Sequence, residues 1–114
     1  MRFFSHIFKT YHRNLLEKLV DKYKYLIRGS ILDIGSKNRR YDHLFNGNVT
    51  AVDVIPNPHL DVREGDITKL EFANNSFDSA LCLEVLHYLN PMDSATGLEE
   101  IIRVLKKEGN AIIS

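Results

Sequence analysis

Five short apolar runs, each bounded by turn-forming residues, constrain the fold of this chain more than any other feature. The runs are SILDI (30–34), VTAVDV (49–54), LDVREGD (60–66), the stretch from Phe77 to Leu83, and AIIS (111–114). The segments between them have the patterns of helices, turns or loops. Strands that alternate with helices or crossover loops are typical of a parallel sheet with helices on its faces. The sequence therefore predicts an α/β fold with an open, mainly parallel sheet and flanking helices.

Helices are expected in three places around these strands. Apolar residues recur at helical spacing through residues 1–29, which predicts one or two amphipathic helices in a basic N-terminal helical segment. The segment NRRYDHLFNGN (38–48) is predicted as a brief helix stopped by its Asn-Gly pair. A third helix is predicted from Pro91 to about Lys107, because proline is favoured in the first turn of a helix. The segment ITKLEFANNS (67–76) is short for a helix and is predicted as a turn or loop.

Charge is unevenly distributed, although the formal net charge of the 114 residues is zero. Residues 1–29 contain seven Lys or Arg and two acids, whereas residues 30–114 contain eight and thirteen. A basic segment can face a membrane or a nucleic acid, or it can dock on its own acidic domain. We favour the second interpretation. The sequence has no strong signal for nucleic-acid binding, and contact of residues 1–29 with a membrane surface is the less favoured alternative.

One cysteine, Cys82, excludes an internal disulfide, and no Cys/His cluster has the spacing of metal ligands. We therefore expect a reducing, cytoplasmic location and no metal site. The N-terminal sequence is interrupted by basic residues and is unlike a signal peptide. A chain of this length is expected to form one domain.

Three acids stand at the ends of three successive predicted strands, where ligands bind in open parallel sheets. Asp33 precedes Gly35, and a carboxylate there repels a pyrophosphate and attracts an amine or a cationic ligand. This argues against a dinucleotide loop, which has three glycines. Asp53 lies where an acid usually accepts hydrogen bonds from ribose hydroxyls, and Asp66 is able to meet an adenine amino group. A single such acid is more often a helix cap or a turn residue, but the series of three favours a ligand site.

Several segments in order resemble the motifs of class I S-adenosylmethionine-dependent methyltransferases of the type 11 sort. They are ILDIGS, VTAVDV, GDITKLEFANNSFD, ALCLEVLHYL and EEIIRVLKKEGNAIIS. The resemblance covers Ser30 to Ser114 and implies a Rossmann-like sheet. The family normally has seven strands, and this chain stops at the start of the fifth. Residues 30–114 are therefore expected to form a partial methyltransferase-like cofactor-binding domain that lacks the usual last two strands.

The resemblance also implies roles for individual residues in binding S-adenosylmethionine. Asp33, Gly35 and Ser36 would hold the methionine amino end, and Asp53 with Val54 would lie at the ribose. Asp66 and Ile67 would frame the adenine. Leu83 and Glu84 would border the sulfonium.

The loop after the first of these strands departs from the family pattern. The family usually has glycines where Lys37 and Arg39 stand. A lysine is compatible with the tight turn if its φ stays negative and its side chain points away. A positive φ at such a position disfavours a residue other than glycine by about 1 kcal/mol or more.

Two further side chains are candidates for roles in the reaction. His87 follows the fourth strand, and the pKa of an unperturbed histidine suits a general base for an acceptor that must lose a proton. The alternative is a histidine that packs in the turn or caps a helix. Family members often place an aromatic residue of an N-terminal helix over the cofactor, and Tyr11 is the candidate, with a core position as the favoured alternative.

Three functions remain open at this point. The first is methyl transfer from S-adenosylmethionine to an unidentified acceptor, taken as a small molecule by default. The second is a catalytically inactive methyltransferase-like module with a binding or regulatory role, and the third is another nucleotide-binding α/β domain such as an oxidoreductase. An apolar fifth strand at a sheet edge is a pairing hazard. It implies a fragment, a partner or homodimer that covers the edge, or a fold that closes in another way.

Overall fold

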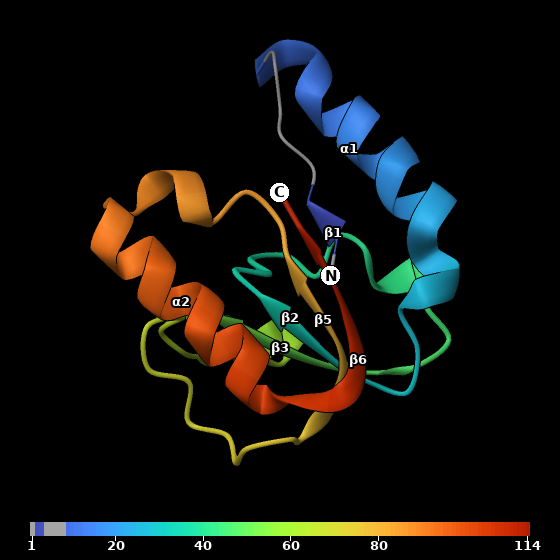
Figure 1. Cartoon of the computed structure of the whole chain (residues 1–114). Coiled ribbons are helices and arrows are strands. Elements are labelled where there is room, and N and C mark those ends of the chain that lie inside the picture. Colours follow the sequence, from blue (N-terminus) through green and yellow to red (C-terminus); the bar gives the residue numbers. More distant parts are fainter. Residues whose placement is uncertain (1, 4–8) are drawn as a thin grey trace.

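The computed structural model of the chain describes residues 2, 3 and 9–114. A parallel sheet of six strands in the order β1-β6-β5-β2-β3-β4 forms its centre (Figure 1). The strands are β1 Arg2–Phe3, β2 Ser30–Ile34, β3 Asn48–Asp53, β4 Val62–Glu64, β5 Phe77–Cys82 and β6 Leu105–Ile113. The sheet confirms the predicted Rossmann-like fold, and β2 to β6 correspond in order to the five predicted strands. Strand β4 is shorter than predicted, and β6 starts at Leu105, six residues before its predicted start.

Helices α1 (Lys9–Tyr23) and α2 (Pro91–Val104) cover opposite faces of the sheet (Figure 1). Alternate residues of each strand face opposite helices, because side chains in a strand point to the two faces in turn. Leu32 packs in the cluster that includes Ile101 of α2. Its neighbour Ile31 packs with Val20 of α1. Both sheet faces are therefore apolar and buried, as expected for a parallel sheet.

The predicted helix at 38–48 is wrong, because the chain there forms a run of turns and one short 3₁₀ helix, Asp42–Leu44. Arg39 has a φ of 53°, which lies in the left-handed region and is incompatible with an α-helix passing through it. Similar 3₁₀ helices occupy Lys24–Leu26, Pro58–Leu60 and Leu86–Tyr88. The crossovers after β2 and β3 are thus compact turns rather than helices.

Helix α2 ends at Val104, three residues before the predicted end, and the chain passes directly into β6. The carbonyls of Arg103 and Val104 accept hydrogen bonds from Asn75 N and Ser76 N, and these contacts replace a further helical turn. The pairing of β6 with β5 is irregular at this point, because Phe77 faces Leu105 whereas Ser79 faces Asn110.

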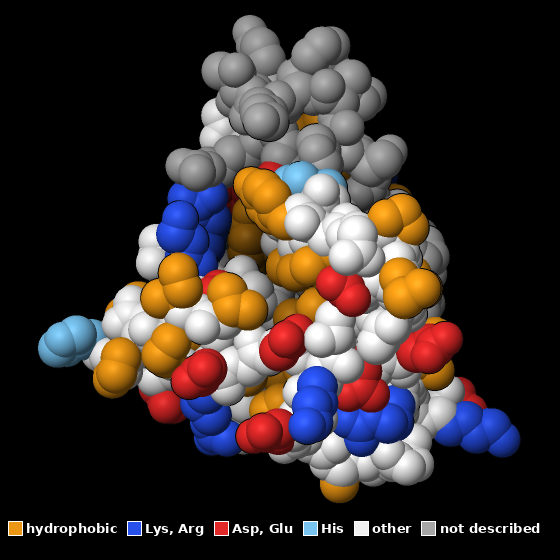
Figure 2. Space-filling model, turned by 90° about the vertical axis from the view of Figure 1, so that its left-hand side faces the viewer, with side chains coloured by type: hydrophobic (Ala, Val, Ile, Leu, Met, Phe, Trp, Pro, Cys, Tyr) orange, Lys and Arg blue, Asp and Glu red, His pale blue; other side chains and the backbone are white. Residues whose placement is uncertain are grey.

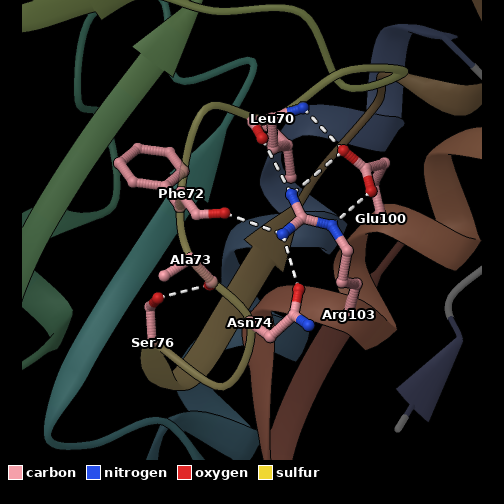
Figure 3. Close-up of polar contacts among 7 residues, drawn as sticks. All are labelled: Leu70, Phe72, Ala73, Asn74, Ser76, Glu100 and Arg103. Carbon is pink, nitrogen blue, oxygen red and sulfur yellow. Dashed lines mark hydrogen bonds and ion pairs between the residues drawn. The ribbon is translucent and has the colours of Figure 1, made fainter.

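The segment between β4 and β5 is a loop, as predicted, and the guanidinium of Arg103 holds it against α2 (Figure 3). Arg103 donates hydrogen bonds to the carbonyls of Leu70 and Phe72 and to the side chain of Asn74. Its Nε lies 2.6 Å from Oε2 of Glu100, and Oε1 of Glu100 accepts a hydrogen bond from Leu70 N. A planar guanidinium with five donors can bind several oxygens at once.

Strand β1 lies beside β6, with Arg2 opposite Ile112 and Phe3 opposite Ile113. The apolar end of β6 is therefore paired within the chain. Within the described part of the chain, no helix combines the length and the apolar character needed to cross a bilayer.

Candidate functional site

The carboxyl ends of β5, β2, β3 and β4 lie side by side at one edge of the sheet. Ile34 pairs with both Val52 and Cys82, and Asp53 pairs with Glu64. The predicted site residues lie at these strand ends or directly after them. The topology therefore gathers them at a single edge, where ligands bind in folds of this kind.

At the end of β2, Asp33 is 3% exposed. Its neighbours Leu32 and Ile34 pack on the α2 side, so Asp33 lies on the α1 face of the sheet. Burial raises the pKa of its carboxyl to about 7, and the carboxylate of Asp42 acts in the same direction. The buried Ser36 hydroxyl lies near enough to lower that pKa, but it has no hydrogen-bond partner of normal geometry. The Ser36 hydroxyl is therefore a buried polar group without a partner among the described residues.

Gly35 begins the turn after β2 with a φ of 71°. A Cβ at this position would lie 2.2 Å from Cγ2 of Val85, so the site requires glycine for space as well as for conformation. The amides of Gly35 and Ser36 both donate to the carbonyl of Val52. The turn is thereby fixed between the ends of β3 and β5.

Asp53 at the end of β3 is half-buried and joins two loops. Its Oδ2 accepts a hydrogen bond from Lys37 N at 3.0 Å, and its Oδ1 accepts one from Ile55 N at 3.0 Å. A carboxylate has about four acceptor sites, so each oxygen can accept one more hydrogen bond. Val54 is 67% exposed beside it.

Asp66 after β4 is exposed and closes a local turn, with its Oδ1 accepting hydrogen bonds from both N and Oγ1 of Thr68. These hydrogen bonds hold the pKa of Asp66 below its usual range. Its neighbour Ile67 is buried in the core. Asp66 and Val54 both line a groove of about 690 Å³ along the β4 side of the sheet.

After β5, Leu83 is buried, and Glu84 has a φ of 61° with its amide donating to Oγ of Ser114. His87 lies in the short helix that follows, exposed, with its ring centroid 4.1 Å from that of Tyr88.

Figure 2 shows one side of the molecule, where hydrophobic and acidic side chains are interspersed rather than gathered into one charged patch. The side chain of Tyr11, the candidate for covering the cofactor, is outside the part of the chain whose side chains are described.

Both residues that stand in place of glycine have a positive φ, 54° at Lys37 and 53° at Arg39, so the turn has the conformation that disfavours residues other than glycine. Sequence reasoning missed what holds this loop. The guanidinium of Arg39 bonds Asp42 and three backbone carbonyls from other segments. The spacing of Arg39 and Asp42 was the one available signal, since oppositely charged side chains three residues apart often pair.

A family model described as a methyltransferase domain matches residues 32–113. No curated protein matches the sequence significantly. The match spans all the strand ends described above and most of the chain.

Solved structures with the same fold cover most of this chain. The PH0226 protein from Pyrococcus horikoshii has a TM-score of 0.61 at 23% identity, covering 90% of this chain and 53% of its own. The 1,6-didemethyltoxoflavin-N1-methyltransferase from Burkholderia thailandensis has a TM-score of 0.64 at 23% identity, and the match covers 84% of this chain and 48% of that one. It was solved with 1,6-didemethyltoxoflavin and S-adenosylhomocysteine bound. The cyclase SpnF has a TM-score of 0.66 at 23% identity, and the match covers 83% of this chain and 42% of that one. The chain thus spans about half the length of these structures, and likeness at this identity establishes the fold alone.

Proposed function

The chain belongs to the methyltransferase domain family, and from this membership we propose that it binds S-adenosylmethionine at the carboxyl edge of its sheet for methyl transfer. The proposal extends to an acceptor of small-molecule size. One observation carries the proposal. Asp53 at the end of β3 accepts a hydrogen bond from Lys37 in the turn after β2, so the carboxyl groups of Asp33 and Asp53 stand at the ends of adjacent strands whose loops are bonded to each other. The S-adenosylhomocysteine bound to the related fold from Burkholderia thailandensis supports the choice of cofactor.

The residues present fit such a ligand by the chemistry of their polar groups. Asp33 is a buried carboxyl without a cationic partner at ion-pair distance among the described residues, and the ammonium of a methionine end would supply one. The unsatisfied Ser36 hydroxyl is the second polar group at this end. Burial of an unpaired charge is costly, and this raises the pKa of Asp33 to about 7. A cationic group beside Asp33 would favour its ionised form.

The ribose and adenine ends are assigned by the same reasoning. Asp53 has unused acceptor capacity on both oxygens, which suits two neighbouring ribose hydroxyls. Val54 offers exposed apolar surface beside it, and Asp66 with Ile67 is the expected border of the adenine. Leu83 and Glu84 are the expected border of the sulfonium at the end of β5.

When bound, S-adenosylmethionine supplies an activated methyl group on a positively charged sulfur. The protein then contributes mainly by alignment, because an in-line displacement depends on the placement of the acceptor. His87 is the proposed base where the acceptor must lose a proton, since it follows β5 and its ring is exposed. Its ring lies against that of Tyr88, with the two planes tilted by 38°.

Calorimetric titration with S-adenosylhomocysteine tests the proposal. We expect saturable binding, and we expect Asp53→Asn to weaken it about tenfold or more, because an amide nitrogen cannot accept the hydrogen bonds that a carboxylate oxygen accepts. Glu108→Gln is the control: it removes an exposed acid near the amino edge of the sheet and should leave affinity unchanged.

Absence of binding at millimolar ligand would refute the proposal, and preferential binding of NADH would favour the oxidoreductase alternative. Binding without methyl transfer to any acceptor would favour the inactive module. Equal affinity of Asp53→Asn and the unchanged protein would show that the ribose lies elsewhere.

A further inference from the structure

The loop after β2 contains two residues other than glycine in the left-handed region, Lys37 and Arg39. Glycine adopts this conformation without steric hindrance, whereas a Cβ disfavours it. Such a conformation persists in a folded protein only where surrounding contacts hold it. The contacts of this loop therefore show which interactions hold Lys37 and Arg39 in the left-handed conformation.

The Arg39 side chain makes four hydrogen bonds that join three segments. Its Nε donates to Oδ2 of Asp42 at 2.6 Å, within the loop itself. Its Nη2 donates to the carbonyl of Val49 in β3 at 3.0 Å. Its Nη1 donates at 3.2 Å to the carbonyls of both Leu60 and Asp61, in the turn that precedes β4. Only a guanidinium has the planar fork of donors that this arrangement uses.

The same loop reaches the proposed cofactor site at its other end. Two residues before Arg39, the amide of Lys37 donates to Asp53, the residue proposed to hold the ribose. Three residues before Lys37 the loop leaves β2 beside Asp33, the residue proposed to hold the amino end. The segment from Gly35 to Arg39 is therefore held at one end by β2 and at the other by Arg39.

We propose that Arg39 is the positioning residue of this loop: it fixes the loop on β3 and on the turn before β4, and thereby holds the Lys37–Asp53 contact in the geometry that receives the cofactor. The inference rests on the proposed function of the site. Arg39 itself touches β3 and the turn before β4, and it acts on the ligand through Lys37 and Asp53. A glycine-rich turn adopts this loop geometry because glycine is conformationally free. Here the hydrogen bonds of the Arg39 side chain hold the same geometry instead.

The chain offers a matched control in Arg103. That side chain forms the same kind of clamp, with its Nε 2.6 Å from an acid three residues away in the sequence and its other nitrogens on backbone carbonyls of Leu70 and Phe72 (Figure 3). It lies at the end of α2 that leads into the start of β6, which is the amino edge of the parallel sheet. Arg103→Lys therefore removes a comparable clamp from a different loop, and the hydrogen bonds of Arg103 given above do not involve Lys37 or Asp53.

The decisive variant is Arg39→Gly, measured with S-adenosylhomocysteine by calorimetry. Glycine tolerates a φ of 53°, so this variant keeps the loop conformation accessible while it removes the whole arginine side chain and with it the guanidinium. We expect its affinity to fall about tenfold, and Arg39→Lys to show a similar loss, since an ammonium cannot reproduce the planar fork. Arg103→Lys should lose clearly less affinity than either Arg39 variant, because its clamp holds a different loop.

Amide hydrogen exchange measured without ligand supplies the second readout. We expect the Lys37 amide to exchange about tenfold faster in Arg39→Gly and Arg39→Lys, but not in Arg103→Lys, because local opening of the loop breaks its bond to Asp53. This measurement needs no ligand, so it tests the role of Arg39 even if the unchanged protein does not bind S-adenosylhomocysteine. A failure to bind would refute the proposed function and not the role of Arg39 in the loop.

The opposite result is equally definite. If Arg39 is only a tolerated replacement for glycine, Arg39→Gly relieves the strained φ, binds as tightly as the unchanged protein or tighter, and leaves exchange at Lys37 unaltered. Either unaltered affinity in a binding-competent background or unaltered exchange at Lys37 would overturn the inference.

Discussion

At the scale of single residues, Asp33 is the side chain whose environment departs most from that of an exposed acid. It is buried at the end of β2, and burial together with the nearby carboxylates of Asp42 and Asp53 raises its pKa to about 7, while Ser36 and Arg39 act in the opposite direction. Perturbed carboxyls of this kind occur preferentially at functional sites. A group that titrates close to neutral pH should also couple ligand binding to proton release.

We therefore expect the affinity for S-adenosylhomocysteine to rise with pH by up to about tenfold per unit between pH 5 and 7, because the ligand's ammonium favours the ionised form of Asp33. Calorimetry in two buffers of different ionisation enthalpy should detect protons released at pH 6. Asp33→Asn should bind weakly and release none. Equal affinity of the unchanged protein at pH 5 and pH 8 would contradict this assignment.

For single residues, the sequence predicted where the site residues lie in the strands better than it predicted their backbone conformation and contacts. The spacing of Asp33, Asp53 and Asp66 placed each near a strand end, because strand ends can be recognised from apolar runs and turn residues. The sign of φ at Lys37 stayed open at this level, and the bonds of Arg39 to the carbonyls of Val49, Leu60 and Asp61 were missed. Those partners come from segments 10 to 22 residues away, and no local pattern specifies them.

At the scale of elements, α2 shows how one helix separates a buried face from an exposed one. Ile101 is fully buried among Leu32, Val52 and Ala80, whereas the adjacent Ile102 is 59% exposed. Neighbouring residues on a helix point about 100° apart, so two identical side chains in sequence can have opposite roles.

Truncation of these two isoleucines should therefore have very different effects. We expect Ile101→Ala to lower the free energy of unfolding by about 2–5 kcal/mol, because it removes buried methyl groups and leaves a cavity. Ile102→Ala, the matched control, should change it by less than about 0.5 kcal/mol. Urea unfolding followed by circular dichroism measures both, and similar losses in the two variants would show that α2 packs through a different face.

The boundaries of elements were harder to predict than their order. The residues after α2, Leu105 to Lys107, continue a plausible helical pattern, so the helix was extended over them. In the structure the last carbonyls of α2 are bonded by Asn75 and Ser76, and Leu105 instead starts β6. The competing partners belong to a distant loop, so tertiary contact overrode a local preference.

At the scale of the whole molecule, the two edges of the sheet hold acids in opposite states. At the amino edge, Asp78 of β5 accepts hydrogen bonds from the amide and hydroxyl of Ser30 in β2 and from Lys106 in β6, and so joins three strands. The amide of Ser30, followed by Lys106 and the Ser30 hydroxyl, lowers the pKa of Asp78 to about 2. At the carboxyl edge, burial raises the pKa of Asp33.

The order of the strands was only partly accessible from the sequence. Alternation of strands and crossovers indicated a parallel sheet, but the pairing of β2 with both β3 and β5 is a property of the folded chain. The pairing of β1 with β6 was not predicted either, because Arg2 and Phe3 have no strand pattern of their own and gain one only from a strand 110 positions along the chain.

These opposite shifts predict how stability depends on pH in the absence of ligand. The folded pKa of Asp33 lies above its unfolded value of about 4, so its stabilising contribution is complete below pH 4 and is lost as pH rises through 7. A shift of this size corresponds to at most about 4 kcal/mol. The folded pKa of Asp78 lies below its unfolded value, so its contribution is complete above pH 4 and is lost as pH falls towards 2.

The free energy of unfolding should therefore be highest near pH 4–5 and decline on both sides, as urea titrations from pH 2.5 to 8 would measure. Asp33→Asn should flatten the decline between pH 4 and 7 and make the protein more stable than the unchanged one at pH 8, and Asp78→Asn should flatten only the acid side. Saturating S-adenosylhomocysteine should stabilise the unchanged protein more at pH 8 than at pH 5, because the ligand compensates the buried carboxylate only where it is ionised. A stability maximum at pH 8 without ligand would show that Asp33 is not the neutral, buried carboxyl on which cofactor binding is proposed to act.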